Sequence, residues 1–304
     1  MNYTSYKPNF FLVGAPRCGT TALYTYLSEH PDVAMPIYDK EPHYFGSDLI
    51  SPRFARFRGN EDKYLRLFKH GQNCKRIGEA SVFYLYSTTA AQEIHEYNPE
   101  AKILIMVRNP ADMLFSYYLK LHGNQHEPLP SFSEALEAEE RRKKNLDLPV
   151  NMYLPKQVLF YREMASFASQ IQRFYDAFGK EQVRVTVFDD FKNDTPKAYQ
   201  EILAFLEVDS NFQTELKPMN STSTFQSPFI RKMVQNRLLV KLGDWFYPIA
   251  APLYAQIMKL NRVNVSRPKL EPQLRQELLD ELRPEIDALS TLLDRDLSYW
   301  YSDY

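Results

Sequence analysis

The chain has 304 residues with 37 basic and 38 acidic side chains, so it can bury a large core but has almost no net charge to attract a polyanion. This balance argues against a nucleic-acid partner, and two cysteines, Cys18 and Cys74, are too few for a disulfide framework and lack the spacing of metal ligands. No apolar run approaches the roughly 20 residues that cross a bilayer, and no secretory signal opens the chain. We therefore expect a cytoplasmic protein that has no membrane partner.

The first buried strand is predicted at residues 10–14, where an apolar run ends at Gly14, and a helix is predicted to begin after Gly19. This order of strand, glycine-rich turn and helix is typical of a loop that binds phosphate through backbone N–H groups. A nucleoside triphosphate loop has Lys directly after its second glycine, but Thr20 and Thr21 follow here, and the nearest cation is Arg17. The loop therefore indicates another kind of phosphate ester.

The first helix should stop near His30-Pro31, and a short strand at residues 33–35 leads into an irregular stretch, residues 38–45. Open α/β sheets place their sites immediately beyond strand ends. Glu41 and His43 are therefore the two candidate general bases, although a solvated loop without function is an equally good interpretation. Residues 51–60, with three arginines around two phenylalanines, are predicted to form a mobile, solvated surface segment or lid.

The clearest buried parallel strand is predicted at residues 103–107, and it places Arg108 at its carboxyl end. Asn109-Pro110 is predicted to begin a helix, with Ser116 about two turns along it. Arg108 and Ser116 can converge on one anion, because arginine supplies a planar fork of donors and serine a short one. The alternative is a surface ion pair for Arg108 and a helix-face hydroxyl for Ser116.

The second half of the chain is predicted to alternate helices with a last strand. We expect a loop at residues 122–130, one charged helix at 132–144 with a solvated Arg141–Lys144 cluster, and one long helix at 155–178. A strand at 183–188 and a returning helix complete an α/β fold of the P-loop type, a parallel sheet flanked by helices on both faces. Residues 210–304 are predicted to be a mainly helical extension of a single domain that spans residues 1–304.

Taken together, these motifs resemble the sulfotransferases that use 3′-phosphoadenosine 5′-phosphosulfate (PAPS), especially the heparan sulfate branch and its bacterial relatives. The resemblance covers nearly the whole chain. Its most specific parts are Pro16–Leu23, as the 5′-phosphosulfate loop, and Val107–Tyr118, as the 3′-phosphate site. Residues 40–45, 78–81 and 292–300 also fit this branch.

The resemblance implies in-line transfer of a sulfonate from PAPS to a hydroxyl, amine or guanidine of a small molecule or natural product. Adenosine 3′,5′-bisphosphate would be the second product, and no metal takes part in the family's reaction. It makes Glu41 the general base, because this branch has a glutamate in a matching Lys-Glu-x-His motif, with His43 as the alternative base. Arg17 would also be catalytic, and Ala80 stands where many heparan sulfate enzymes have a lysine.

The resemblance also assigns the donor-binding residues. Those for the 5′-phosphosulfate are Arg17, Cys18, Gly19, Thr20, Thr21 and Ala22; those for the 3′-phosphate are Arg108 and Ser116; those in a loop over the nucleotide are Arg262, Arg267 and Lys269.

Three alternatives remain at this point: a P-loop nucleoside or small-molecule kinase, a carbohydrate sulfotransferase, and a nucleotide-binding regulatory protein that has lost its base. The acceptor pocket is expected between loops 38–60 and 122–153, whose residues match nothing specific enough to name a substrate.

Overall fold

The computed structural model describes residues 6–37, 39–150, 152–216 and 268–302, and the backbone of residues 223–225 and 262–264. The chain divides into two compact units, residues 1–217 with 270–304, and residues 218–269. In the second unit, β6 (Ser223–Phe225) pairs with β7 (Arg262–Asn264) in an antiparallel ribbon. The sequence reasoning expected no strand after residue 210, because two three-residue strands are too short to show a period.

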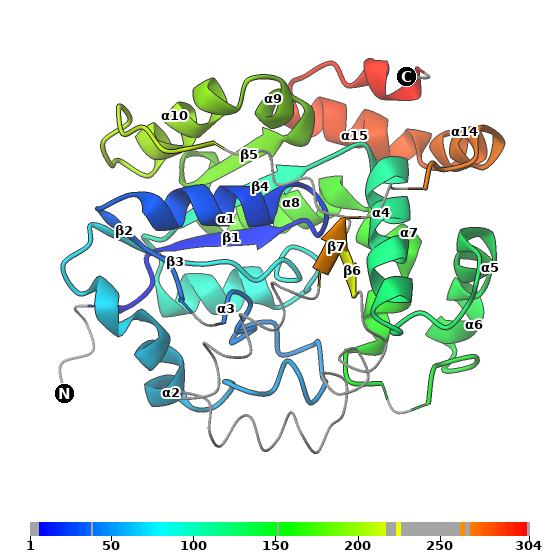
Figure 1. Cartoon of the computed structure of the whole chain (residues 1–304), viewed down its shortest axis with the longest axis horizontal. Coiled ribbons are helices and arrows are strands. Elements are labelled where there is room, and N and C mark those ends of the chain that lie inside the picture. Colours follow the sequence, from blue (N-terminus) through cyan, green and yellow to red (C-terminus); the bar gives the residue numbers. More distant parts are fainter. Residues whose placement is uncertain are drawn as a thin grey trace. The chain divides into compact units, whose positions relative to one another are not determined.

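The centre of the larger unit is a parallel sheet of five strands (Figure 1). Its order is β2 (Val33–Ala34), β3 (Arg76–Glu79), β1 (Phe10–Gly14), β4 (Lys102–Val107), β5 (Val183–Val187). Every residue of β1 is buried, which explains its continuous apolar run. From β1 the chain runs to β2 on one side of the sheet and later crosses to β4 on the other. The carboxyl ends of β1 and β4 therefore flank the point where open α/β sheets bind ligands.

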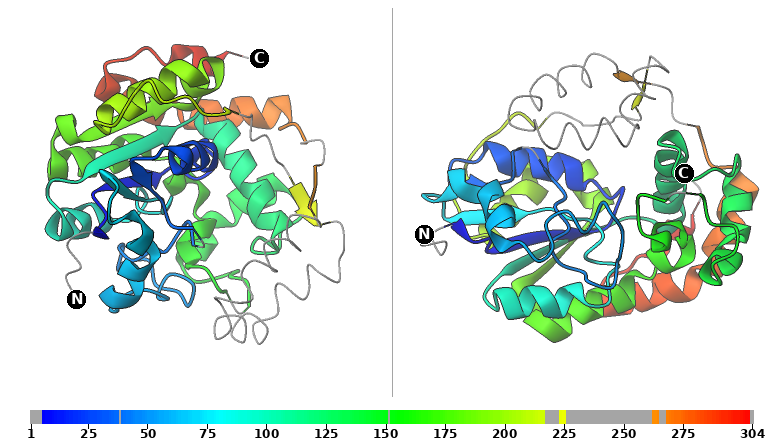
Figure 2. Two further views of the ribbon diagram at one scale, coloured as in Figure 1. Left: turned by 60° about the vertical axis from the view of Figure 1, so that its left-hand side comes forward. Right: turned by 90° about the horizontal axis from the view of Figure 1, so that it is seen from below.

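Helices cover both faces of this sheet, as predicted (Figure 2). One face carries α1 (Thr20–Glu29) and α10 (Thr195–Phe205), and the other α3 (Ala90–Tyr97), α8 (Phe167–Phe178) and α15 (Arg283–Leu293). The remaining helices are α2 (Glu61–Leu65), α4 (Pro110–Gly123), α5 (Phe132–Glu137), α6 (Glu139–Lys143), α7 (Tyr161–Met164), α9 (Phe188–Asn193) and α14 (Pro272–Glu281), with 3₁₀ turns at Arg66–Gly71, Lys156–Leu159, Lys180–Gln182 and Ser298–Tyr301. Within the described part of the chain, no helix is both long and apolar enough to span a bilayer.

Two predicted helices are broken in the structure. Residues 155–178 form a 3₁₀ turn, α7 and α8 rather than one helix. The reason is that Val158, Leu159, Phe160 and Tyr161 are all buried, and no single face of one helix can bury four consecutive residues. Residues 132–144 likewise form α5 and α6, which meet at Ala138.

The segment 51–60 is not the mobile, solvated lid that the sequence suggested. Phe54 and Phe57 are buried in the core, at 1% and 3% exposure. Arg53 and Arg56 both bind the buried carboxylate of Asp39, with N–O distances of 3.2 and 2.6 Å. The arginines therefore fasten this segment to the loop that carries Glu41.

Candidate active site

The turn between β1 and α1 is a tight loop whose glycines are required sterically. A Cβ on Gly14 would lie 2.6 Å from the Cβ of Leu85, and a Cβ on Gly19 would lie 2.9 Å from the ring of Phe188. Gly19 also has a φ of 90°, which favours glycine, and it precedes α1 without any side-chain cap. The first N–H groups of α1 therefore lack a side-chain acceptor, and an anion can supply one.

The side chains of this loop differ in what they can contribute. Cys18 is fully buried, and burial raises the pKa of its thiol to about 12 despite the nearby arginines. The thiol therefore stays protonated, and Cys18 can offer a ligand only its backbone N–H. Thr20 is buried at 4% exposure, whereas Thr21 is exposed and Ala22 is half-buried.

Arg17 joins the phosphate loop to the residues that follow β4. Its Nε donates a hydrogen bond to Oγ of Ser116, 2.9 Å away, on helix α4. The Arg108 guanidinium lies over the ring of Phe188, 5.0 Å from its centroid, and 4.0 Å from the Asp112 carboxylate. Burial, and then the charge of Arg108, lower the pKa of Arg17. Two cations and a buried hydroxyl thus converge where the strand order switches, which is a site suited to anions.

Lys40 lies between the phosphate loop and Glu41. Its Nζ donates to Oγ1 of Thr21 at 2.9 Å and is 3.6 Å from Oε1 of Glu41. Burial lowers the pKa of Lys40, and the Glu41 carboxylate partly opposes this effect. Sequence reasoning gave Lys40 no role, and the available signal was its position directly before the candidate base.

Glu41 and His43 face each other, with Oε2 and Nε2 3.5 Å apart. Burial alone would raise the pKa of Glu41, but His43, Lys40 and Arg53 outweigh it and hold that pKa at about 2. Burial lowers the pKa of His43, whose ring stacks on Phe54 with the centroids 3.7 Å apart. At neutral pH the pair is therefore a carboxylate beside an uncharged imidazole.

The two candidate bases differ in their access to solvent. The Glu41 side chain is 30% exposed, whereas that of His43 is 3% exposed. The Nδ1 atom of His43 is buried and has no hydrogen-bond partner among the described residues. An acceptor arriving from solvent can therefore reach Glu41 more readily than His43.

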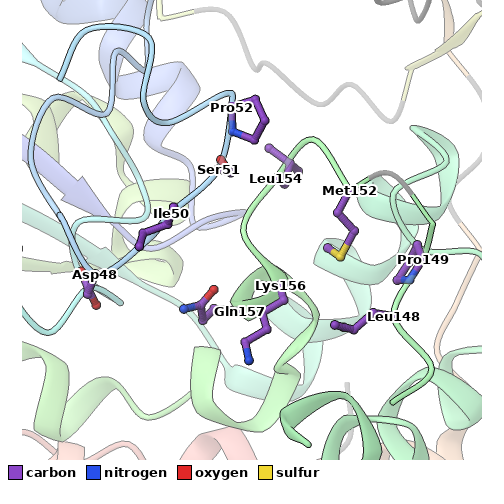
Figure 3. A pocket seen from close by; sticks show the side chains of 10 residues that line it. All are labelled: Asp48, Ile50, Ser51, Pro52, Leu148, Pro149, Met152, Leu154, Lys156 and Gln157. Atoms are coloured by element: carbon purple, nitrogen blue, oxygen red, sulfur yellow. The ribbon is translucent and has the colours of Figure 1, made fainter. Parts of the chain in front are cut away.

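A pocket of about 440 Å³ lies between residues 48–52 and 148–157 (Figure 3). Most of its lining is apolar, from Ile50, Pro52, Leu148, Pro149, Met152 and Leu154. The Asp48 carboxylate in its wall already accepts hydrogen bonds from the hydroxyls of residues 87–89, and Lys156 donates to Asn145 at 2.6 Å. Both of these charged groups are thus already hydrogen-bonded, and most of the remaining lining is apolar.

Arg53 connects this pocket to Glu41. Its backbone N–H donates to the carbonyl oxygen of Tyr153 at 3.3 Å and so joins the two segments that form the walls. Its guanidinium donates to the carbonyl oxygen of Glu41 at 3.4 Å. The same residue thus joins the pocket walls through its backbone and contacts the candidate base through its side chain.

The residues 7–241 match the family model described as the sulfotransferase domain. The chain belongs to the sulfotransferase family. It is 27% identical over 251 residues to carbohydrate sulfotransferase 15 of Rattus norvegicus, an alignment that covers 66% of this chain and 44% of that protein. It is 28% identical over 207 residues to the bifunctional heparan sulfate N-deacetylase/N-sulfotransferase 3 of Homo sapiens, covering 66% of this chain and 22% of that protein. The matches thus span less than half the length of these curated relatives.

The fold of this sulfotransferase is also that of a solved bacterial structure. The sulfotransferase from Alicyclobacillus acidocaldarius is 32% identical, with a TM-score of 0.73, and the match covers 97% of this chain and 99% of that one.

Not every predicted site residue can be placed in this sulfotransferase. Arg267 and the side chain of Arg262 lie outside the described residues, and Lys269 is exposed in the smaller unit, so these three remain predictions. The backbone of Arg262 lies in β7 and not in the expected loop. Among the described side chains there is no group of three or more His, Cys, Asp or Glu residues that could hold a metal ion.

Proposed function

We propose that this protein transfers a sulfonate from PAPS to a hydroxyl, amine or guanidine of a small-molecule acceptor and releases adenosine 3′,5′-bisphosphate. The observation that carries the proposal is the Arg17–Ser116 hydrogen bond, which brings together the loop after β1 and the helix after β4. A ligand with phosphates at both ends of one adenosine needs two such anion sites. Thr20 in place of the Walker lysine disfavours the kinase alternative.

The donor would be held by groups from both strand ends. The uncapped N–H groups at the start of α1, with Arg17, would bind the 5′-phosphosulfate, and Arg108 and Ser116 would bind the 3′-phosphate. Because Nε of Arg17 already donates to Ser116, we expect Arg17 to exchange this bond for donor oxygens when PAPS binds.

In the proposed transfer, Glu41 accepts the proton of the acceptor O–H or N–H group as that atom bonds to sulfur. The bond between sulfur and the bridging oxygen breaks, and its electron pair stays on the 5′-phosphate of the leaving nucleotide. Lys40 and the α1 amides would stabilise the charge that develops on the transferred group. When Lys40 turns to the sulfonate, Glu41 loses one of the contacts that hold its pKa low, which makes it a better base.

We propose that the acceptor carries an apolar body, which the pocket between residues 48–52 and 148–157 would bind. The relatives' names favour a carbohydrate acceptor as the second candidate. A sulfated polysaccharide would need a row of cations, whereas Lys156 is the one basic side chain among the described residues that line the pocket. A natural product in the cytoplasm is therefore our first candidate for the acceptor.

We also propose that both compact units act as one sulfotransferase domain. The family match, residues 7–241, crosses from the larger unit into the smaller one. The match ends before Arg262, Arg267 and Lys269, so their assignment to the nucleotide rests on the resemblance of the sequence alone.

Titration calorimetry with adenosine 3′,5′-bisphosphate in EDTA, against ATP with Mg²⁺, tests the donor site. We expect tight metal-free binding of the bisphosphate, and Ser116→Ala should weaken it by roughly 10- to 100-fold, since a hydrogen bond to a charged group contributes about 1.5–3 kcal/mol. Ser28→Ala is the matched control, because Ser28 is an exposed residue of α1 whose hydroxyl donates to the carbonyl oxygen of Tyr24 within the same helix. Tighter binding of ATP with Mg²⁺, or equal losses in both variants, would contradict the proposal.

A further inference from the structure

Glu79, the last residue of β3, has a fully buried carboxyl group that is surrounded by hydroxyl groups. Ser81 donates to its Oε1 at 2.6 Å, Tyr64 donates to its Oε2, and Tyr84 is its third hydrogen-bond partner. The hydroxyl protons of Ser81 and Tyr64 therefore point towards the carboxyl oxygens of Glu79. Because the group is inside the core, the network must be fully paired to be stable.

Each of the three hydroxyl residues also holds one of three consecutive residues in the loop after Glu41. Ser81 Oγ accepts a hydrogen bond from the backbone N–H of His43 at 3.0 Å. Tyr84 Oη accepts from the backbone N–H of Phe45 at 3.1 Å.

The third contact is between aromatic rings. The Tyr64 ring stacks on that of Tyr44, with the centroids 4.2 Å apart and an interplanar angle of 10°. Residues 43, 44 and 45 are thus held by three side chains that all converge on Glu79.

This part of the loop needs such support. His43 has a φ of 50°, a left-handed conformation that costs a non-glycine residue free energy and persists only where the surroundings impose it. The His43 ring in turn lies 3.5 Å from Glu41. The path from Glu79 to the proposed base therefore runs through Ser81 and His43.

We propose that Glu79 is a positioning residue for the reaction, which orients Glu41 by holding residues 43–45 through Ser81, Tyr84 and Tyr64. This role rests on the proposed function of Glu41 as base. Glu79 itself is buried beneath the loop and acts only through it.

The test compares Glu79→Gln with Glu93→Gln, a matched change in a second carboxylate that anchors the same loop further on. Glu93 accepts hydrogen bonds from the backbone N–H groups of Gly46 and Ser47, at 2.7 and 3.0 Å. We expect Glu79→Gln to lower kcat by about 10- to 100-fold, the cost of a misplaced catalytic group, with KM for PAPS within about twofold. Glu93→Gln should leave kcat within about twofold.

A second comparison separates positioning from general loss of structure. In a Glu41→Gln background, Glu79→Gln should lower the residual kcat by less than about twofold, because the group that it positions is absent. An equal loss in both backgrounds, or an unchanged kcat in the single variant, would overturn the proposal. If Glu79→Gln does not fold, Ser81→Ala removes one of the three contacts and is expected to show the same dependence on Glu41. The affinity for adenosine 3′,5′-bisphosphate is measured in the same proteins. If the unmodified protein does not bind this nucleotide, the proposed function fails, and the role of Glu79 is not what the result contradicts.

Discussion

Replacing Arg142 with methionine should destabilise the protein strongly, although a run of four basic residues is usually a solvated surface. Arg142 is fully buried and makes two hydrogen bonds of 2.7 Å to the buried carboxylate of Glu127. Tyr161 Oη and the Leu129 N–H donate to the same carboxylate at 2.9 and 3.0 Å. In Arg142→Met, Glu127 keeps these two donors and loses its counter-charge.

Breaking a buried ion pair from one side costs about 3–5 kcal/mol. The entropy of unfolding is about 2.1 cal/mol/K per residue, or roughly 0.6 kcal/mol/K for 304 residues. The expected fall in Tm is therefore about 5–8 °C, which differential scanning calorimetry resolves.

Arg141→Met is the matched control, because the Arg141 side chain is 54% exposed and pairs with an Asp147 side chain that is 52% exposed. An exposed pair contributes about 0–1 kcal/mol, so its Tm should fall by less than about 2 °C. Adding Glu127→Gln to Arg142→Met should recover part of the loss, since the amide buries no charge. A Tm for Arg142→Met within about 1 °C of the control, or a double variant less stable than Arg142→Met, would refute this reasoning.

Four further outcomes follow from the site. Lys40→Met should lower kcat by about 100-fold, which is the usual effect of removing one transition-state donor. The affinity for adenosine 3′,5′-bisphosphate should change by less than about threefold, because this nucleotide has no sulfonate. Equal losses in kcat and in this affinity would contradict the prediction. Because the pKa of Glu41 is about 2 with Lys40 in place, its carboxylate stays ionised in the free enzyme, and kcat/KM for a primary-alcohol acceptor should be flat between pH 8 and 5. A decline of kcat/KM over that range would exclude Glu41 as the base. With primary alcohols from ethanol to octanol as acceptors, kcat/KM should rise about fourfold per CH₂ group. Met152→Asp should reduce this dependence of kcat/KM on chain length, whereas Val150→Asp, at an exposed position outside the pocket lining, should leave it unchanged. Burial raises the pKa of Glu79 to about 7, although the hydroxyl of Ser81 donates to it. The folded state therefore binds this proton more tightly than the unfolded state does. The free energy of unfolding should fall by about 3 kcal/mol as the pH rises from about 4.5 to 7. Thermal unfolding of Glu79→Gln should lack this component, and parallel pH curves for the two proteins would contradict it.

The amino-acid sequence alone determined the central part of the fold and located the two turns that we propose as anion sites. The strands at residues 10–14 and 103–107 were predicted because a parallel strand buried on both faces is a continuous apolar run. The spacing of Gly14 and Gly19 marks the turn, and Asn109-Pro110 is a local helix start, with the Asn109 side chain capping α4. Signals of this kind lie within a few residues and can be identified without a partner.

Only the tertiary structure decided which side chains meet. Arg17 and Ser116 are 99 positions apart, and they are neighbours because the sheet order places β4 beside β1. Lys40 reaches Thr21, Arg142 is buried against Glu127, and Ser81 accepts from the backbone of His43, each through a contact between distant parts of the chain. A charged residue has the same letter whether it is solvated or buried in a pair, and its partner is chosen by packing, which no local period in the sequence records.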